Sequence, residues 1–164
     1  MTRALALAAL LALSGCGLQP MYAGGSSGAV VSSLPGIQVA PIPERAGWLV
    51  HNALVDRLGG KSENPFYRLE VELDDDLTGF GIRGDNAVTR ERRTLRARYR
   101  LVELSTGQVV LDATAGSDAG IDVVSSEYAT VAAEQTAQER LAAVVADQMV
   151  SRLALFVRNR AKAQ

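Results

Sequence analysis

Residues 88–104, VTRERRTLRARYRLVEL, decide the fold because they alternate between apolar and basic side chains along one long segment. Leu95, Ala97, Tyr99 and Leu101 fall on one face of an extended chain, and the arginines between them fall on the other. A period of two over this length predicts a half-buried strand from about Val88 to Leu104. The rest of the chain must therefore supply partner strands for its edges and a cover for its apolar face.

The segments on either side predict three more strands. Residues 66–74, FYRLEVELD, alternate cleanly and carry acids on the outer face. Residues 105–107, Ser-Thr-Gly, predict a tight turn, after which residues 109–124 return as a hairpin strand that is interrupted near 116–120. A short strand over 37–42, bounded by prolines, completes the set.

Two segments have the periodicity of amphipathic helices. The first, from Pro43 to Leu58, places apolar residues at 50, 54 and 58 on one stripe and ends at a Gly-Gly pair. The second is rich in alanine, begins after a capping Ser126 and runs to about Arg158 without an internal glycine or proline. The order strand, helix, three strands, helix predicts an α+β fold: an antiparallel four-stranded sheet with two helices packed on one face.

The N-terminal segment has the features of an export signal. The ten apolar residues from Ala4 to Leu13 follow a basic Arg3 and are too few to span a bilayer as a helix. Leu13-Ser14-Gly15-Cys16 resembles the lipobox of bacterial lipoproteins, which implies a signal peptide at 1–15 and acylation of the Cys16 thiol. Residues 16–36 are then the lipidated cysteine and a Gly/Ser/Pro-rich tether typical of flexible linkers, and 37–164 form the domain. An ordinary secretory signal with an incidental cysteine is the alternative.

Composition and motif content argue against an enzyme. The net charge of −1 gives no reason to expect a nucleic acid partner. His51 is the single histidine and lies beside an apolar helical stripe, and the single cysteine is assigned to the lipobox, so no metal site, cofactor site or thiol dyad is expected. The cluster Asp74-Asp75-Asp76 could hold a divalent cation weakly, but a solvated turn is the expected role.

Residues 79–84, Gly-Phe-Gly-Ile-Arg-Gly, match the spacing of a dinucleotide-binding loop. That motif must open a helix, whereas a strand rich in Thr and Arg follows here. The stretch 75–86 is instead expected to be a loop whose glycines permit positive φ. Phe80 and Ile82 are then exposed apolar residues at its tip and candidates for contact with a partner or a membrane.

Four features together resemble one known family. They are the strand–helix–strands–helix order, the Arg-rich strand after a Gly81–Asp85 loop, the Ala-rich final helix, and the run Cys16-Gly17-Leu18-Gln19-Pro20-Met21-Tyr22. On these features the chain resembles the LptE family of lipopolysaccharide-assembly lipoproteins, in its alphaproteobacterial form. The resemblance implies a lipid anchor on the periplasmic side of the outer membrane and a place in the lipopolysaccharide translocon. There the protein would plug the LptD β-barrel, assist its assembly and help insert lipopolysaccharide. An auxiliary lipoprotein of another, ABC-type, envelope lipid transporter is the alternative.

Six arginines within residues 90–100 are the sharpest charge feature. Guanidinium groups bind phosphates bidentately and are weakly hydrated, so the row suits the phosphorylated headgroup of lipopolysaccharide. The alternative is a salt ladder, in which Glu70, Glu72 and Asp74 neutralise most of the row and leave the end near Arg90 and Arg92 free. Both hypotheses stay open from the sequence. The candidate lipopolysaccharide-binding residues are Arg90, Arg92, Arg93, Arg96 and Arg98.

Overall fold

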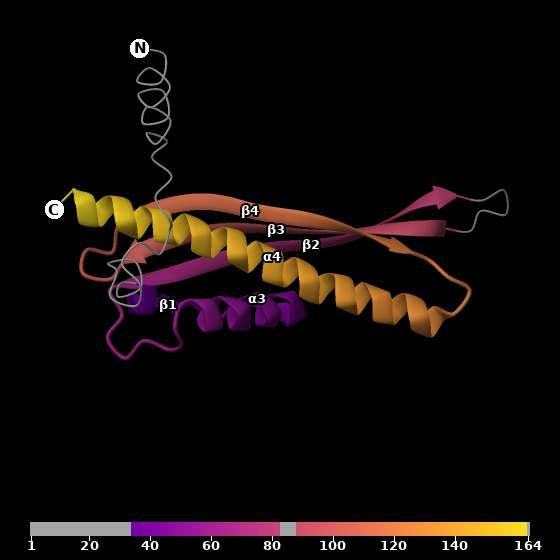
Figure 1. The fold of residues 1–164 in the computed structure, drawn as a ribbon, viewed down its shortest axis with the longest axis horizontal. Coiled ribbons are helices and arrows are strands. Elements are labelled where there is room, and N and C mark those ends of the chain that lie inside the picture. The colour runs from indigo at the N-terminus through magenta and orange to yellow at the C-terminus, as the bar shows by residue number, and fades with distance from the viewer. Residues whose placement is uncertain (1–33, 83–87, 164) are drawn as a thin grey trace, which may run out of the picture.

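The computed structural model describes residues 34–82 and 88–163 (Figure 1). The expectations for the signal peptide, for Cys16 and for tether residues 17–33 lie outside this part of the chain. The α+β class with four strands and two helices is confirmed. The elements are a 3₁₀ turn (Leu34–Gly36), β1 (Ile37–Val39), α3 (Glu44–Arg57), β2 (Tyr67–Ile82), β3 (Val88–Glu103), β4 (Val109–Asp122) and α4 (Glu127–Lys162).

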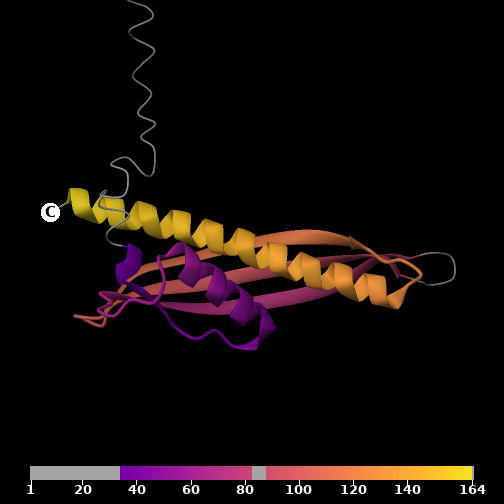
Figure 2. The ribbon, with the colours of Figure 1, turned by 60° about the horizontal axis from the view of Figure 1, so that its bottom comes forward.

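The strands form one sheet in the order β1-β2-β3-β4. Strands β2, β3 and β4 are antiparallel, as predicted, but β1 pairs with β2 in parallel, from Ile37 opposite Tyr67 to Val39 opposite Leu69. The sheet is therefore mixed rather than purely antiparallel. The connection explains the difference, because α3 runs back alongside the sheet and returns the chain to the end where β1 began (Figure 2).

The β2–β3 hairpin is longer than the sequence predicts. Strand β2 continues to Ile82 and stays paired with β3 through Asp76, Gly79 and Phe80, so the prediction of a loop beginning at Asp75 is wrong. Strand β4 likewise runs through residues 116–120 without the predicted interruption. Turn-forming residues remain extended here because β3, with its continuous alternation, offers backbone partners along its whole length on both sides.

Both helices cover the same face of the sheet (Figure 2). Helix α4 begins at the predicted cap, where the Ala129 N–H donates to the Ser126 hydroxyl at 3.4 Å, and then crosses the strands diagonally. One apolar core fills the space between the two layers. Its fully buried members come from every main element except β4 and include Ile37, Leu54, Leu69, Tyr99, Leu101, Met149 and Leu153.

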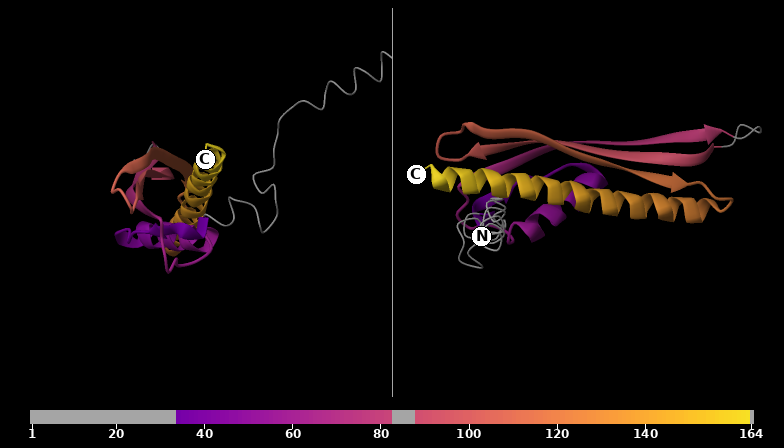
Figure 3. Two further views of the ribbon diagram at one scale, coloured as in Figure 1. Left: turned by 90° about the vertical axis from the view of Figure 1, so that its left-hand side faces the viewer. Right: turned by 45° about the horizontal axis from the view of Figure 1, so that its top comes forward.

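The molecule is elongated, since the 36 residues of α4 span about 54 Å (Figure 3). The proximal end contains the 3₁₀ turn, the β3–β4 turn and the C-terminus of α4. The distal end contains the far part of the β2–β3 hairpin and the connection from β4 to α4. Leu34 at the proximal end is only 5% exposed and Gly36 is buried, so these two residues assigned to the tether pack with the domain.

Candidate functional site

Strand β3 divides the arginines between the two faces of the sheet. Arginines at the even positions 90, 92, 96, 98 and 100 lie on the outer face, away from the helices, whereas Arg93 shares the inner face with Leu95 and Tyr99. The side chain of Arg93 is 16% exposed, compared with 64% for Arg90 and 62% for Arg98. Arg93 is therefore not part of the exposed row in which the sequence placed it.

Arg93 instead belongs to a polar network between the sheet and the helices. It donates from Nε and Nη2 to the two carboxylate oxygens of Asp75, at 2.8 and 2.7 Å. Gln138 of α4 also donates to Asp75, at 2.8 Å, and accepts from Nε of Arg45 at 3.1 Å. Burial alone would raise the pKa of Asp75, but these hydrogen bonds and the charge of Arg93 hold the pKa below its ordinary value. The network joins α3, α4, β2 and β3, so the role of Arg93 is structural.

The predicted salt ladder is present in part. Arg100 contacts Glu72 at 3.2 Å and Glu70 at 3.6 Å, as the alternation of the two strands predicts. Arg98, however, turns to the other neighbouring strand and donates to both oxygens of Asp112, at 3.3 and 2.9 Å. The hydrogen bond from Arg98 lowers the pKa of Asp112. The ladder therefore draws on both β2 and β4.

The salt-ladder hypothesis left the end of the row near Arg90 and Arg92 free of acids, and for Arg90 the structure shows otherwise. Asp122 lies directly opposite Arg90 in the β3–β4 register and accepts from its Nε at 3.0 Å. Within the described residues, no ion pair is found for Arg92 or Arg96. These two arginines are therefore the ones whose charge is available for an anionic ligand.

Arg92 lies beside an exposed aromatic side chain. Its guanidinium sits over the Phe80 ring, 5.4 Å from the centroid, and Phe80 is 39% exposed. Phe80 belongs to strand β2, where it pairs with Arg90, and Ile82 is the last residue of the same strand. The prediction that both residues occupy a loop tip is wrong, but Phe80 and Arg92 together form an apolar and cationic spot on the outer face.

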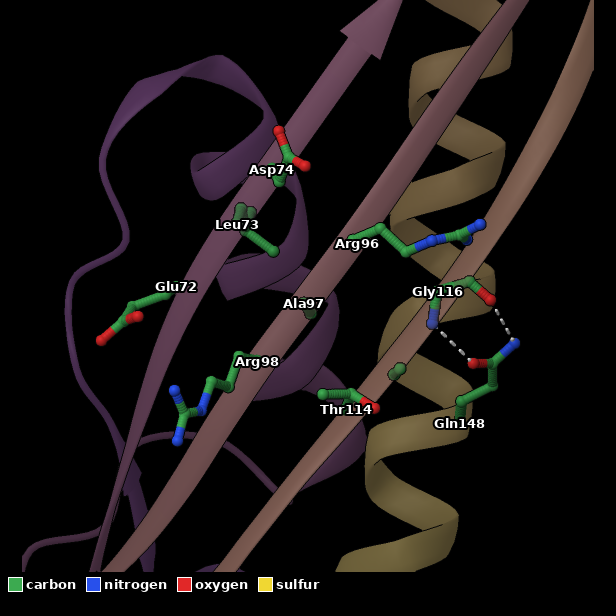
Figure 4. A pocket seen from close by; sticks show the side chains of 10 residues that line it. Glu72, Leu73, Asp74, Arg96, Ala97, Arg98, Thr114, Gly116 and Gln148 are labelled. Atoms are coloured by element: carbon green, nitrogen blue, oxygen red, sulfur yellow. Dashed lines mark hydrogen bonds between the residues drawn. The ribbon is translucent and has the colours of Figure 1, made fainter.

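Arg96 lies in an open groove of about 680 Å³ over β2, β3 and β4 (Figure 4). Its side chain extends across β4 at Gly116, where an added Cβ would lie 2.7 Å from Cδ of Arg96. Glu72, Asp74 and Arg98 also line the groove, so charges of both signs border it.

Gln148 of α4 closes the β4 edge beside this groove. The Gly116 N–H donates to Oε1 of Gln148 at 3.1 Å, and Nε2 of Gln148 donates to the Gly116 carbonyl at 3.3 Å (Figure 4). Neither Gly116 nor Gln148 was singled out from the sequence, because an amide on a helix gives no local signal of the strand that it will meet.

A pair of carboxyl groups meets on the inner face at the distal end. Burial raises the pKa of Glu91, and the neighbouring Glu134 of α4 raises it further. Oε2 of Glu91 has no hydrogen-bond partner among the described residues.

The other groups considered in the sequence do not assemble into a reactive centre in the described part of the chain. Residues 34–82 and 88–163 contain no cluster of three or more His, Cys, Asp or Glu side chains suited to a metal ion. His51 lines a cavity of about 240 Å³ between β1 and α3 together with Lys61 and Ser62. Asp74 and Asp76 lie in strand β2 rather than in a turn. None of the described helices has the length and apolar character needed to cross a bilayer.

The fold and the outer face define a class: an α+β domain whose four-stranded sheet is covered by helices on one face and presents arginines on the other. Residues 34–153 match the family described as LptE: Lipopolysaccharide-assembly, and the chain belongs to this family. The family is one of non-catalytic lipoproteins of the cell envelope. The resemblance seen in the sequence is therefore confirmed.

Solved structures support the fold. A lipoprotein from Caulobacter crescentus CB15 superposes with a TM-score of 0.68 at 27% identity, over 81% of this chain and 98% of that chain. Rare lipoprotein B from Shewanella oneidensis gives 0.59 at 9% identity, over 75% and 95% of the two chains. Lipoprotein B from Nitrosomonas europaea gives 0.58 at 11% identity, over 75% and 88%. No curated protein sequence matches the chain significantly.

Proposed function

We propose that the chain is the outer-membrane lipoprotein subunit of the lipopolysaccharide translocon, anchored through Cys16 on the periplasmic side. In this role it plugs the LptD β-barrel, assists the assembly of that barrel and helps to insert lipopolysaccharide into the outer leaflet. Membership of the lipopolysaccharide-assembly family over residues 34–153 supports the proposal. A domain with an arginine-bearing sheet face suits a subunit that acts by binding.

Arg92 and Arg96 carry the proposed contact with lipopolysaccharide. Both lie on the outer face without an acidic partner in the described residues, so binding a phosphate breaks no existing ion pair. Guanidinium binds phosphate with two parallel hydrogen bonds. Phe80, next to Arg92, adds apolar surface for the lipid part of the ligand. Arg90 and Arg98 can contribute only by giving up their bonds to Asp122 and Asp112.

The partner is tested by purification from membranes. The tagged full chain, extracted in detergent, should recover an LptD-type β-barrel, and a matched Cys16→Ala chain should incorporate no labelled palmitate and leave the outer-membrane fraction. Recovery of an ABC-type transporter component in place of a barrel would favour the alternative function. Palmitate in the Cys16→Ala chain would contradict the proposed anchor.

The binding site is tested by two charge-reversal variants that change the net charge by the same amount. Arg92→Glu with Arg96→Glu should weaken lipopolysaccharide binding by about a hundredfold or more, since two charge-assisted contacts are lost and each is worth about 1.5–3 kcal/mol. The control is Arg140→Glu with Arg152→Glu, which changes two exposed arginines of α4 by the same charge. Thermal melts show whether each variant is folded. Equal weakening in both double variants would mean that only the overall charge matters.

A further inference from the structure

Strand β4 forms an edge of the sheet, and half of its backbone hydrogen-bonding groups point away from β3. In an antiparallel pair, alternate residues of each strand bond to the neighbouring strand. The N–H of Val123, directly after β4, donates to the Thr89 carbonyl at 3.0 Å, so the odd positions bond to β3. The even positions therefore direct their N–H and C=O groups to the open edge; they are Asp112, Thr114, Gly116, Asp118, Gly120 and Asp122.

One of these outward positions has a partner, and that partner imitates a strand. The side-chain amide of Gln148 accepts from the Gly116 N–H and donates to the Gly116 carbonyl, as a residue of an adjoining antiparallel strand would (Figure 4). Among the described residues, no backbone group bonds to the outward groups of Thr114, Asp118 or Gly120. The edge is therefore shaped to accept peptide groups, and in the described part of the chain Gln148 occupies only the middle of it.

Two hollows meet beside this edge. The open groove described above lies over β2, β3 and β4, and Val144, Ser151 and Leu155 of α4 line a second hollow of about 510 Å³. Gln148 lines both hollows, so they adjoin at the β4 edge next to Gly116. Val144 and Leu155 are exposed apolar side chains. A strand added to β4 would therefore find room for the side chains on each of its two faces.

The chemistry of the edge selects its occupant. A row of outward N–H and C=O groups is complemented by an extended backbone, which makes strand addition the mode of binding. Asp118 is exposed and has no ion pair among the described residues, and Asp112 and Asp122 lie on the same face. A second copy of β4 would set the same acids against these. A segment with lysine or arginine opposite Asp118 instead gains a cross-strand ion pair.

We propose that the β4 edge binds an extended segment of the β-barrel partner by strand addition. The segment replaces Gln148 at Gly116, places a basic residue opposite Asp118 and turns its alternate, apolar residues toward the hollow of α4. The inference rests on the function proposed above, which supplies the partner, and it assigns the contact surface. An added strand continues the sheet sideways, so the outer face near Arg92 stays open for lipopolysaccharide.

Proline at an outward position tests strand addition. Asp118→Pro removes an N–H that makes no bond to β3, so the sheet keeps its ladder, while an added strand loses a donor and meets the proline ring. The tagged full chain, extracted in detergent, should recover about tenfold less barrel with this change. The matched control, Asp118→Asn, keeps the N–H and removes only the charge, so the loss should be about threefold or less. Thermal melts of both variants should stay close to that of the parent.

Amide hydrogen exchange of the unaltered chain is a second measurement that needs no variant. The outward N–H groups of Thr114, Asp118 and Gly120 should exchange at least about tenfold more slowly in the complex than in the chain alone, while Ser117 and Ala119 are protected in both. Recovery of the barrel without this slowing, or equal recovery by Asp118→Pro, would overturn the inference and leave the proposed function standing. Slowing in the chain alone, together with a dimeric mass, would assign the edge to a second copy and also overturn it. If the parent recovers no barrel, the proposed function fails, and the inference fails with it.

Discussion

The Asp75–Arg93 pair offers the sharpest test of how this fold is stabilised. Replacing Asp75 with alanine removes two charge-assisted hydrogen bonds from Arg93, at 2.8 and 2.7 Å, and one from Gln138. The side chains of Arg93 and Asp75 are only 16% and 11% exposed, so water does not readily replace the lost partner. Breaking a fully buried pair costs 3–5 kcal/mol, and the residual exposure here places the expected loss at the low end, about 3 kcal/mol.

Urea unfolding at neutral pH measures this loss. A destabilisation of about 3 kcal/mol should lower the urea midpoint by about 2 M for a domain of this size. The matched control is Asp112→Ala, which breaks the chemically similar but solvent-exposed pair with Arg98 and should leave the midpoint almost unchanged. Asp75→Leu combined with Arg93→Met should recover most of the stability, because no charge is then left buried. A loss below about 1 kcal/mol for Asp75→Ala would refute the reasoning, since that is the range of surface pairs.

Three further predictions follow from single contacts. Folding lowers the pKa of Asp75 below its ordinary 3.8. The stabilisation supplied by the ionised Asp75 carboxylate is therefore complete above that pH and is lost as the pH falls through the pKa of the folded state. In urea melts, the stability gap between the parent and Asp75→Asn should begin to close below about pH 4. Gln148→Ala should lower the free energy of unfolding by about 1–2 kcal/mol and speed amide hydrogen exchange at Gly116, because the Gly116 N–H and carbonyl lose their partner. Unchanged exchange would contradict the capping of the β4 edge by Gln148. Gly47→Ala should lower the melting temperature, although alanine favours a helix, because the alanine Cβ would lie 2.6 Å from the Ile42 carbonyl oxygen. A gain in stability would show that the backbone before α3 can shift at little cost.

Much of the fold followed from local patterns. The alternation around Tyr99 predicted β3 to within one residue, and the spacing of Val50 and Leu54 predicted α3. Ser126 was identified as the cap of α4, and its hydroxyl accepts the Ala129 N–H. These features could be predicted because periodicity and capping involve residues within a few positions of one another. Strand β2 was predicted too short because turn-forming residues such as Asp75 and Gly79 respond to the partner strand as well as to their own propensity.

The candidate site divides in the same way. The sequence by itself determined that the arginines of residues 90–100 alternate with a buried face, and the odd position of Arg93 was a usable signal that it points inward with Leu95. Only the tertiary structure decided which arginines keep a free charge. Asp112 and Asp122 neutralise Arg98 and Arg90 across 14 and 32 residues of chain, while Arg92 and Arg96 have no such partner in the described residues. Pairings of this kind depend on the register between β3 and β4, which the packing of the whole sheet against α4 sets and no local pattern encodes.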